Sequence, residues 1–270
     1  MIVTVVTPTL NGMQYLGQCI DSVKRNHGTG YEVDHVIVDG GSTDDTVAFA
    51  RRHGLRVLEG KDEGIFDAIN RGSFESEGNL LGFLGADDVM LDGALDAVTA
   101  AYRREWEGWI VGGIRWIDER GYGLGELAAP PSWMTVRMHA CLGWNPIMHM
   151  STYFSREFFE ELGGFDIRYK DSGDYDLFAR ALAREPYRRL SRPLTCFRRT
   201  GHNNSAIHAA RTRAENRSVL EKFGPRSRAE RTLWRYVLKT WLNGRNPSWT
   251  AAKLAGTARR RLGVQEKAYF

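Results

Sequence analysis

The sequence predicts an α/β protein with a mostly parallel central sheet flanked by helices, followed by a basic helical extension. In the first hundred residues, short β-rich runs alternate with segments of helical periodicity, which is typical of βαβ units and parallel strands. Acidic and glycine-rich stretches follow these runs where the expected strands end. Residues 226–270 then carry 11 Lys and Arg against 2 Asp and Glu, whereas the preceding residues are slightly acidic.

The composition fits one large domain with an appendage. The chain has 270 residues, of which 42% are hydrophobic and 26% charged. We expect a domain at 1–224, with a division near residue 90 (1–90 and 91–224), and an extension at 225–270. We expect a cytoplasmic protein for three reasons. No apolar run approaches the roughly 18 residues of a membrane span, and the first residues have the pattern of a strand rather than of a signal peptide. The three cysteines are far apart in the sequence, which does not suggest a disulfide framework.

The first elements follow from alternation and helical spacing. Strands are expected at residues 2–7, 35–38, 55–58 and 80–84, with helices between them, the second running from 42 or 43 to about 52 and the third from 64 to 73. In the second half we expect strands at 109–117 and 151–154, a loop at 118–131, helices at 156–162 and 174–184, and an extended segment at 187–199 broken by Pro193.

Two adjacent acids, Asp87 and Asp88, follow the apolar run 80–84. Carboxylates at the end of a buried strand cost free energy unless something positive lies opposite. In open α/β sheets this edge is where ligands bind, and a divalent cation carrying a phosphorylated ligand is the simplest occupant. A turn with a helix cap is the alternative that the pair alone leaves open.

Other polar loops should reach the same edge of the sheet, because the carboxyl ends of parallel strands gather there. They lie at residues 8–12, 39–42 and 61–64. Asp67 and Asn70 are three residues apart on one face of the next helix, so both could reach one ligand. A turn acid is the alternative role for Asp39, and a solvated helix face is the alternative for Asp67.

Together these motifs resemble the family 2 glycosyltransferases of GT-A fold. The resemblance rests on an ordered set: Val5–Asn11, Val36–Asp44, Asp62–Asn70 and Gly85–Asp88, followed by His149–Ser151, Gly164–Asp166 and Ser172–Leu177. It spans about residues 1–205. Any one of these motifs is weak evidence, whereas their order is strong evidence.

The resemblance implies that residues 1–90 form a nucleotide-sugar-binding half and residues 91–224 an acceptor-side half. It implies an inverting transfer of a sugar from a nucleotide-diphospho-sugar to an acceptor hydroxyl in polysaccharide or lipid-linked glycan synthesis. Uracil is favoured as the base, and thymine and guanine are the alternatives. Asp88 would bind Mn²⁺ or Mg²⁺, Asp87 would contact ribose or donor sugar, and Asp39 would accept the uracil N–H. The residues implied for the donor are Thr7, Pro8, Leu10, Asn11, Asp39, Gly40, Ser42, Gly64, Asp67, Asn70, Ala86, Asp87 and Asp88.

Asp174 is implied as the general base that takes the proton of the acceptor hydroxyl. The family often has Glu-Asp here, and this chain has Gly173-Asp174, so the contact made by the preceding acid is in doubt. An N-cap is the alternative role for Asp174, and Asp176 is the competing candidate. His202 is implied as a metal or phosphate ligand, and His149 as an acceptor or donor contact.

The extension predicts an amphipathic helix. Its apolar and basic residues interleave at helical spacing: Leu233, Trp234, Val237, Leu238, Trp241 and Leu242 with Arg228, Arg231, Arg235 and Lys239; Arg259–Arg261 follow. Such a helix suits an anionic membrane surface, which would make the protein peripheral on the cytoplasmic face of the inner membrane. Packing on the catalytic domain or a homodimer contact are alternatives, and without a recognition motif nucleic acid is disfavoured.

Three other classes compete with the transferase. A sugar nucleotidyltransferase needs basic residues in its first phosphate loop, and residues 7–12 contain none. A dinucleotide-binding dehydrogenase needs the motif G-x-G-x-x-G after a strand, and no such motif follows a predicted strand in this chain. A non-catalytic subunit that binds nucleotide sugar would not need the acid pair together with Asp174.

Overall fold

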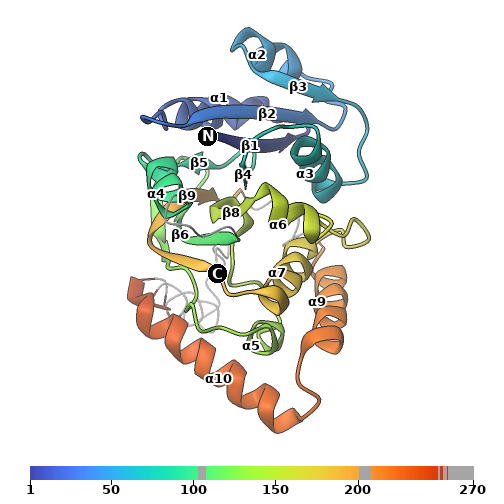
Figure 1. Ribbon diagram of the computed structural model, residues 1–270, viewed down its shortest axis with the longest axis vertical. Coiled ribbons are helices and arrows are strands. Elements are labelled where there is room, and N and C mark those ends of the chain that lie inside the picture. The colour runs from blue at the N-terminus through green and yellow to red at the C-terminus, as the bar shows by residue number, and fades with distance from the viewer. Residues whose placement is uncertain (103–107, 201–207, 249, 252–253, 255–270) are drawn as a thin grey trace, which may run out of the picture.

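The computed structural model describes every residue except 103–107, 201–207, 249, 252–253 and 255–270 (Figure 1). Within the described residues, nine strands form one mixed sheet in the order β3-β2-β1-β4-β8-β6-β9-β5, with β7 paired to β6. The strands are β1 (Ile2–Thr9), β2 (Glu32–Asp39), β3 (Arg56–Glu59), β4 (Leu80–Phe83), β5 (Val89–Met90), β6 (Trp109–Ile117), β7 (Gly123–Leu127), β8 (Thr152–Ser155) and β9 (Arg188–Arg198).

Helices cover both faces of this sheet. They are α1 (Met13–Lys24), α2 (Thr46–Arg52), α3 (Ile65–Phe74), α4 (Ala94–Tyr102), α5 (Val136–Cys141), α6 (Arg156–Glu161), α7 (Gly173–Arg184), α9 (Ala209–Phe223) and α10 (Arg228–Arg245), with a 3-10 turn η1 (His149–Ser151). One core cluster joins α3, α6 and α7 to the sheet, and a second joins α1 and α4 to it. The predicted α/β class is confirmed.

The strand pairings explain where the polar loops meet. β1 pairs in parallel with β2 and β4, and β2 with β3, so these four strands end at one edge. β8 is antiparallel to β4, which brings the start of β8, and η1 before it, to the end of β4. This edge therefore collects chain segments from both halves of the molecule.

Several elements differ from the expectation. The segment 118–131 is not all loop, because β7 pairs with β6 through its backbone. The strand β7 was not predicted because its glycines, Gly123 and Gly125, lower the strand propensity of this segment. The second helix begins at Thr46 rather than at 42 or 43, because residues 39–45 are engaged in a turn. The sequence reading also missed α4, α5 and α9.

The predicted helix in the extension is confirmed as α10. Leu238 and Leu242 on its inner side are buried in the two main core clusters. Trp234 and Trp241 pack against the same clusters. The most apolar side of α10 is thus packed on the main domain, as one of the two alternatives for this helix predicts. In the part of the chain that the structure describes, no helix combines the length and apolar character needed to cross a bilayer.

Candidate active site

The acid pair lies in a tight turn after β4. The backbone N–H of Asp88 donates to the carbonyl of Gly85 at 3.0 Å, which folds the turn back on itself. The side chain of Asp88 is buried, and burial together with neighbouring Asp87 raises the pKa of Asp88 well above its usual range. Burial also raises the pKa of Asp87, while Arg198 and His149 act to lower it. A cation at this place would stabilise both carboxylates in their ionised form.

Arg198, the last residue of β9, binds the turn that contains Asp87 and Asp88. Its backbone N–H donates to Oδ1 of Asp88 at 3.0 Å, and its Nε donates to the carbonyl of Asp87 at 2.8 Å. Its Nη2 donates to Gln18 at 2.7 Å, and the guanidinium lies 4.4 Å from the centre of the Tyr15 ring. The sequence reading missed Arg198, because one arginine in an extended run carries no local signal of burial.

The loops after β1 and β2 are joined to each other. Asn11, whose φ of 51° is unusual for a residue other than glycine, accepts from the Thr43 N–H at 2.8 Å and donates its own N–H to Ser42 at 2.7 Å. Asp39 is buried and accepts from the backbone N–H groups of Gly41 at 2.9 Å and Ser42 at 2.8 Å, and from the Ser42 hydroxyl. Asp39 is thus a turn acid in this structure, and a carboxylate retains further acceptor capacity for a ligand.

Nearby side chains show where this edge is open. Leu10, after the last residue of β1, is 63% exposed, although leucine is usually buried. The hydroxyl of Thr9 is buried without a partner in the described part of the chain. An exposed apolar side chain beside an unpaired polar atom suits a ligand with an apolar face and polar edges.

The predicted Asp67 and Asn70 pair separates in the structure. Asp67 accepts from the Glu63 N–H at 2.9 Å in the loop before α3. Asn70 instead bonds both the N–H and the carbonyl of Phe165, each at 2.8 Å. Asn70 therefore ties α3 to the loop after α6, and only Asp67 stays beside the loop at 61–64.

His149 and Asp174 come together from elements 25 residues apart. Nδ1 of His149 lies 3.6 Å from Oδ2 of Asp174, and both side chains are 18% exposed. Helix α7 begins at Gly173 with Ser172 as its N-cap, so Asp174 is not the cap, and its Oδ1 accepts from the Tyr175 N–H at 2.7 Å. The turn η1, which contains His149, lies at the end of β4 because β8 pairs antiparallel with β4, so His149 and Asp174 are on the side of the acid pair.

The contact between α7 and α3 explains why glycine stands before Asp174. A Cβ on Gly173 would come within 2.6 Å of the Phe66 ring on α3. Any larger residue would push the start of α7 away from α3. Since α3 begins at the donor-side edge, this contact draws Asp174 toward it.

Asp176, the competing candidate for the general base, does not share the surroundings of Asp174 and His149. Its side chain is fully buried, and its two oxygens are held by Arg180 at 2.7 Å and Lys222 at 3.3 Å. Arg180 also donates to the Gly164 carbonyl at 2.8 Å. Asp176 therefore joins α7 to α9 and to the loop after α6, and our proposal assigns it no contact with substrate.

The acid pair fits a divalent cation only in part. Magnesium is commonly held by one or two carboxylates together with substrate phosphates, and Asp87 and Asp88 supply such a pair. Among the described residues, no group of three or more His, Cys, Asp or Glu side chains is placed to hold a metal. The predicted ligand His202 lies outside the described residues.

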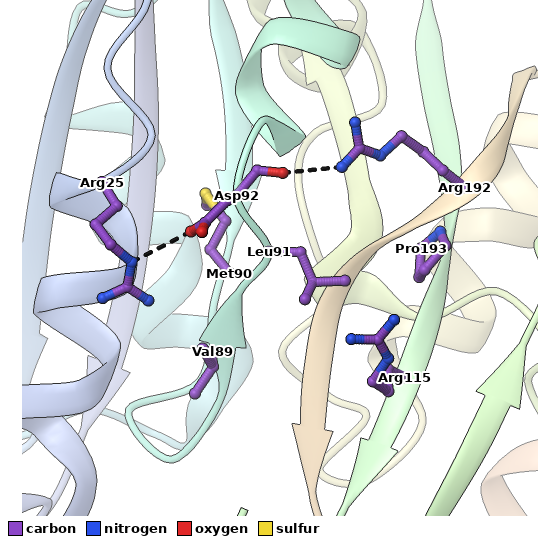
Figure 2. Close-up of a pocket in the computed structure, with 8 residues that line it drawn as sticks. All are labelled: Arg25, Val89, Met90, Leu91, Asp92, Arg115, Arg192 and Pro193. Carbon is purple, nitrogen blue, oxygen red and sulfur yellow. Dashed lines mark hydrogen bonds and ion pairs between the residues drawn. The ribbon is translucent and has the colours of Figure 1, made fainter. Parts of the chain in front are cut away.

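An open hollow of about 500 Å³ lies beyond the acid pair along β5 (Figure 2). Figure 2 shows Asp92 between two arginines: its carboxylate accepts from Arg25 at 3.2 Å, and its carbonyl accepts from Arg192 at 2.8 Å. The predicted donor residues that the structure describes do not line this hollow. Because Asp92 offsets part of its positive charge, we do not assign the diphosphate to it.

Comparison with known proteins decides the family. The model of glycosyl transferase family 2 matches residues 4–163. The chain belongs to this family. It is therefore a nucleotide-sugar-dependent glycosyltransferase.

A curated relative, the PGL/p-HBAD biosynthesis glycosyltransferase of Mycobacterium tuberculosis, is 30% identical over 190 residues, which cover 67% of this family 2 chain and 69% of the relative. Among solved structures, Staphylococcus aureus TarS 1-349 in complex with UDP-GlcNAc has a TM-score of 0.60 at 17% identity, covering 83% of this chain and 74% of that one. Mannosyltransferase PcManGT from Pyrobaculum calidifontis, in complex with GDP-Man and Mn²⁺, has a TM-score of 0.58 at 19% identity, covering 98% and 77%. These two similarities confirm the GT-A-like fold.

Proposed function

We propose that this chain is an inverting, metal-assisted transferase that moves a sugar from a nucleoside-diphosphate sugar, with UDP preferred, to a hydroxyl of a glycolipid or lipid-linked glycan precursor. The observation that carries the proposal is the 3.6 Å approach of His149 to Asp174, on the side of the sheet where β4 leads into the Asp87–Asp88 turn. The name of the mycobacterial relative supports a glycolipid acceptor.

The donor would lie along the ends of β1, β2 and β4. The exposed Leu10 side chain offers an apolar surface for the base, and Asp39 offers remaining carboxylate lone pairs to a base N–H. The loop 61–64 and Asp67 would border the sugar or phosphates. A bound Mn²⁺ or Mg²⁺, held by Asp88 with Asp87 beside it, would offset the charge of the departing diphosphate.

The acceptor hydroxyl would approach from the side of η1 and α7. Asp174 accepts its proton while the oxygen attacks the anomeric carbon, and the bond from that carbon to the diphosphate breaks on the opposite face. One displacement of this kind inverts the anomeric configuration. His149 orients Asp174, because an imidazole N–H at Nδ1 would donate to the carboxylate once the 3.6 Å gap closes.

A panel of nucleotide sugars tests the proposal. With Mn²⁺ present, one donor should raise the melting temperature, since a ligand that binds only the folded state stabilises it by mass action. The same donor should release nucleoside diphosphate when a membrane lipid extract supplies acceptors. If a nucleotide binds but no donor is consumed with any acceptor fraction, the chain is a binding subunit and the catalytic proposal is wrong.

A further inference from the structure

Helix α10 has a second, outward side that its packing does not use. Leu238 and Leu242 on the inner side are 0% and 1% exposed, whereas Leu233 and Tyr236 on the outer side are 54% and 71% exposed. Leu233 and Tyr236 are three residues apart, so they lie side by side on one face of the helix. The part of α10 that could meet another surface is therefore its outer side, and not the tryptophan-bearing side that the sequence pattern emphasised.

The charges on this helix are almost all positive. Between residues 226 and 245 there is one acid, Glu230, and it is engaged by Trp234 at 3.3 Å and Arg137 at 3.6 Å. The basic residues in this range are Arg226, Arg228, Arg231, Arg235, Lys239 and Arg245. Five of them, Arg226, Arg228, Arg235, Lys239 and Arg245, are among the exposed residues. Arg228, Arg235 and Lys239 are spaced by seven and four residues, so they share one exposed, cationic flank of α10 beside Tyr236.

A tyrosine gives this side an amphipathic ring. Indole and phenol rings are enriched at the level of lipid headgroups, where one part of the ring is apolar and the other is wet. Trp133, which is 50% exposed, lies against Trp241 at 6.5 Å and therefore on the tryptophan-bearing side. Leu233 and Tyr236, together with Lys239, define what we call the outer α10 surface.

Helix α10 is tied to the segment that precedes His149. Arg235 donates to the carbonyl of Cys141, the last residue of α5, at 3.2 Å. Asn216 on α9 donates to the Gly143 carbonyl at 3.1 Å. The contacts of α10 thus leave Leu233 and Tyr236 on its outer side uncovered while fixing the helix to the domain.

We propose that the outer α10 surface binds an anionic phospholipid bilayer and lies in its interface without crossing it. Charge complementarity selects this occupant, because a basic helix with exposed Leu and Tyr gains both electrostatic attraction and apolar burial there. A symmetric dimer through the same side would bring two sets of these cations together, which is unfavourable.

Sedimentation of the full chain with vesicles tests this proposal. The wild type should sediment with vesicles of one part phosphatidylglycerol to two parts phosphatidylcholine, more weakly at high salt, and stay in solution with phosphatidylcholine alone. Lys239→Glu should weaken binding about fivefold or more. Its matched control is Arg52→Glu on α2, which Figure 1 shows at the opposite end of the molecule, and which should leave binding unchanged.

A second pair of variants tests the apolar contribution. Tyr236→Ser should weaken vesicle binding about threefold with little change in its salt dependence, since it removes buried apolar area rather than charge. Tyr122→Ser is the control, because Tyr122 is equally exposed at 69% but lies outside the outer α10 surface. Thermal melting of each variant in solution shows that the comparison is made on folded protein.

Three results would overturn the membrane proposal: equal sedimentation with neutral vesicles, equal weakening by Arg52→Glu and Lys239→Glu, or no sedimentation with either vesicle. If the wild type is instead a dimer that Tyr236→Ser dissociates, the surface joins two copies of this chain. Sedimentation needs no sugar transfer, so its failure and a failure of the catalytic proposal are distinguishable.

Discussion

The edge that we propose for the donor, at the ends of β1 to β4, and the side that we propose for the acceptor, at the start of α7, are built by different kinds of contact. In the loops after β2 and β3, an acid binds its own loop: Asp39 accepts from Gly41 and Ser42, and Asp62 accepts from the Gly64 N–H at 3.0 Å. On the acceptor side, the segment before α7 is held by a distant residue. Glu215 on α9 accepts from the N–H groups of Lys170, Asp171 and Ser172 at 2.8–2.9 Å.

This difference teaches that the two halves should respond differently to mutation. A loop whose hydrogen bonds are local keeps its shape when a distant element changes. The start of α7, which carries Asp174, depends on α9 through Glu215 and on α3 through the close approach of Gly173 to Phe66. We therefore expect separate losses of donor binding and of acceptor-side geometry.

The largest effect should come from Asp88→Asn. An amide keeps the shape but loses the charge that a divalent cation needs, so we expect the metal-dependent release of nucleoside diphosphate to fall about a thousandfold. Initial rates titrated with Mn²⁺ measure this. Asp92→Asn, an exposed acid four residues further on, is the control and should keep its metal dependence. A variant at Asp88 that still responds to Mn²⁺ would remove this residue from the metal site.

Glu215→Gln should break the acceptor side selectively. Its three charge-assisted acceptor bonds become weaker, so the free energy of unfolding should fall by about 1–3 kcal/mol. The KM for the acceptor should rise, while the thermal shift given by the donor stays the same. Glu221→Gln on the same helix is the matched control, because Glu221 is 69% exposed. An equal loss of donor binding would show that the two halves are not separable.

A smaller effect concerns acid stability through His139 beneath α7. Its Nε2–H donates to the Tyr175 carbonyl at 3.1 Å, and burial lowers the pKa of His139 from 6.5 to about 4. Between about pH 6.5 and 4, His139 is therefore protonated in the unfolded chain but remains mostly neutral in the folded chain. The free energy of unfolding should fall by up to about 1.4 kcal/mol per pH unit from this residue between pH 6.5 and 4.

Urea unfolding at several pH values measures this contribution. His139→Phe should lower stability at neutral pH, because the hydrogen bond is lost, but reduce the slope below pH 6.5. His27→Gln replaces an exposed histidine and should leave the slope unchanged. If His139→Phe keeps the full slope, His139 does not carry the acid sensitivity.

The sequence was sufficient to predict the strands that end at the donor-side edge and the position of the acid pair. These are short-range properties: an apolar run, then polar residues at its end. Arg198 and Glu215 could not be predicted, because each acts through partners 43 or more residues away. Asn70 shows the same limit, since its helix face was predicted correctly but its side chain pairs with Phe165, 95 residues further on.

The edge strand β7 and helix α9 were missed for physical reasons as well. Glycines let β7 pair through its backbone, although they remove the side-chain alternation that identifies a strand. Helix α9 has one fully buried hydrophobic residue, Val219, so its periodicity is faint. The acceptor side therefore depends on elements whose sequence pattern is weak.

The central claim is that Asp174 performs the proton transfer while the donor site stands apart from it. The direct measurement is nucleoside diphosphate release by Asp174→Asn beside Asp176→Asn, with the Mn²⁺-dependent thermal shift of the donor recorded for both. We predict that Asp174→Asn loses at least about a hundredfold in rate and keeps the donor shift, whereas Asp176→Asn melts earlier but retains the rate while folded. Full activity in Asp174→Asn would contradict the account.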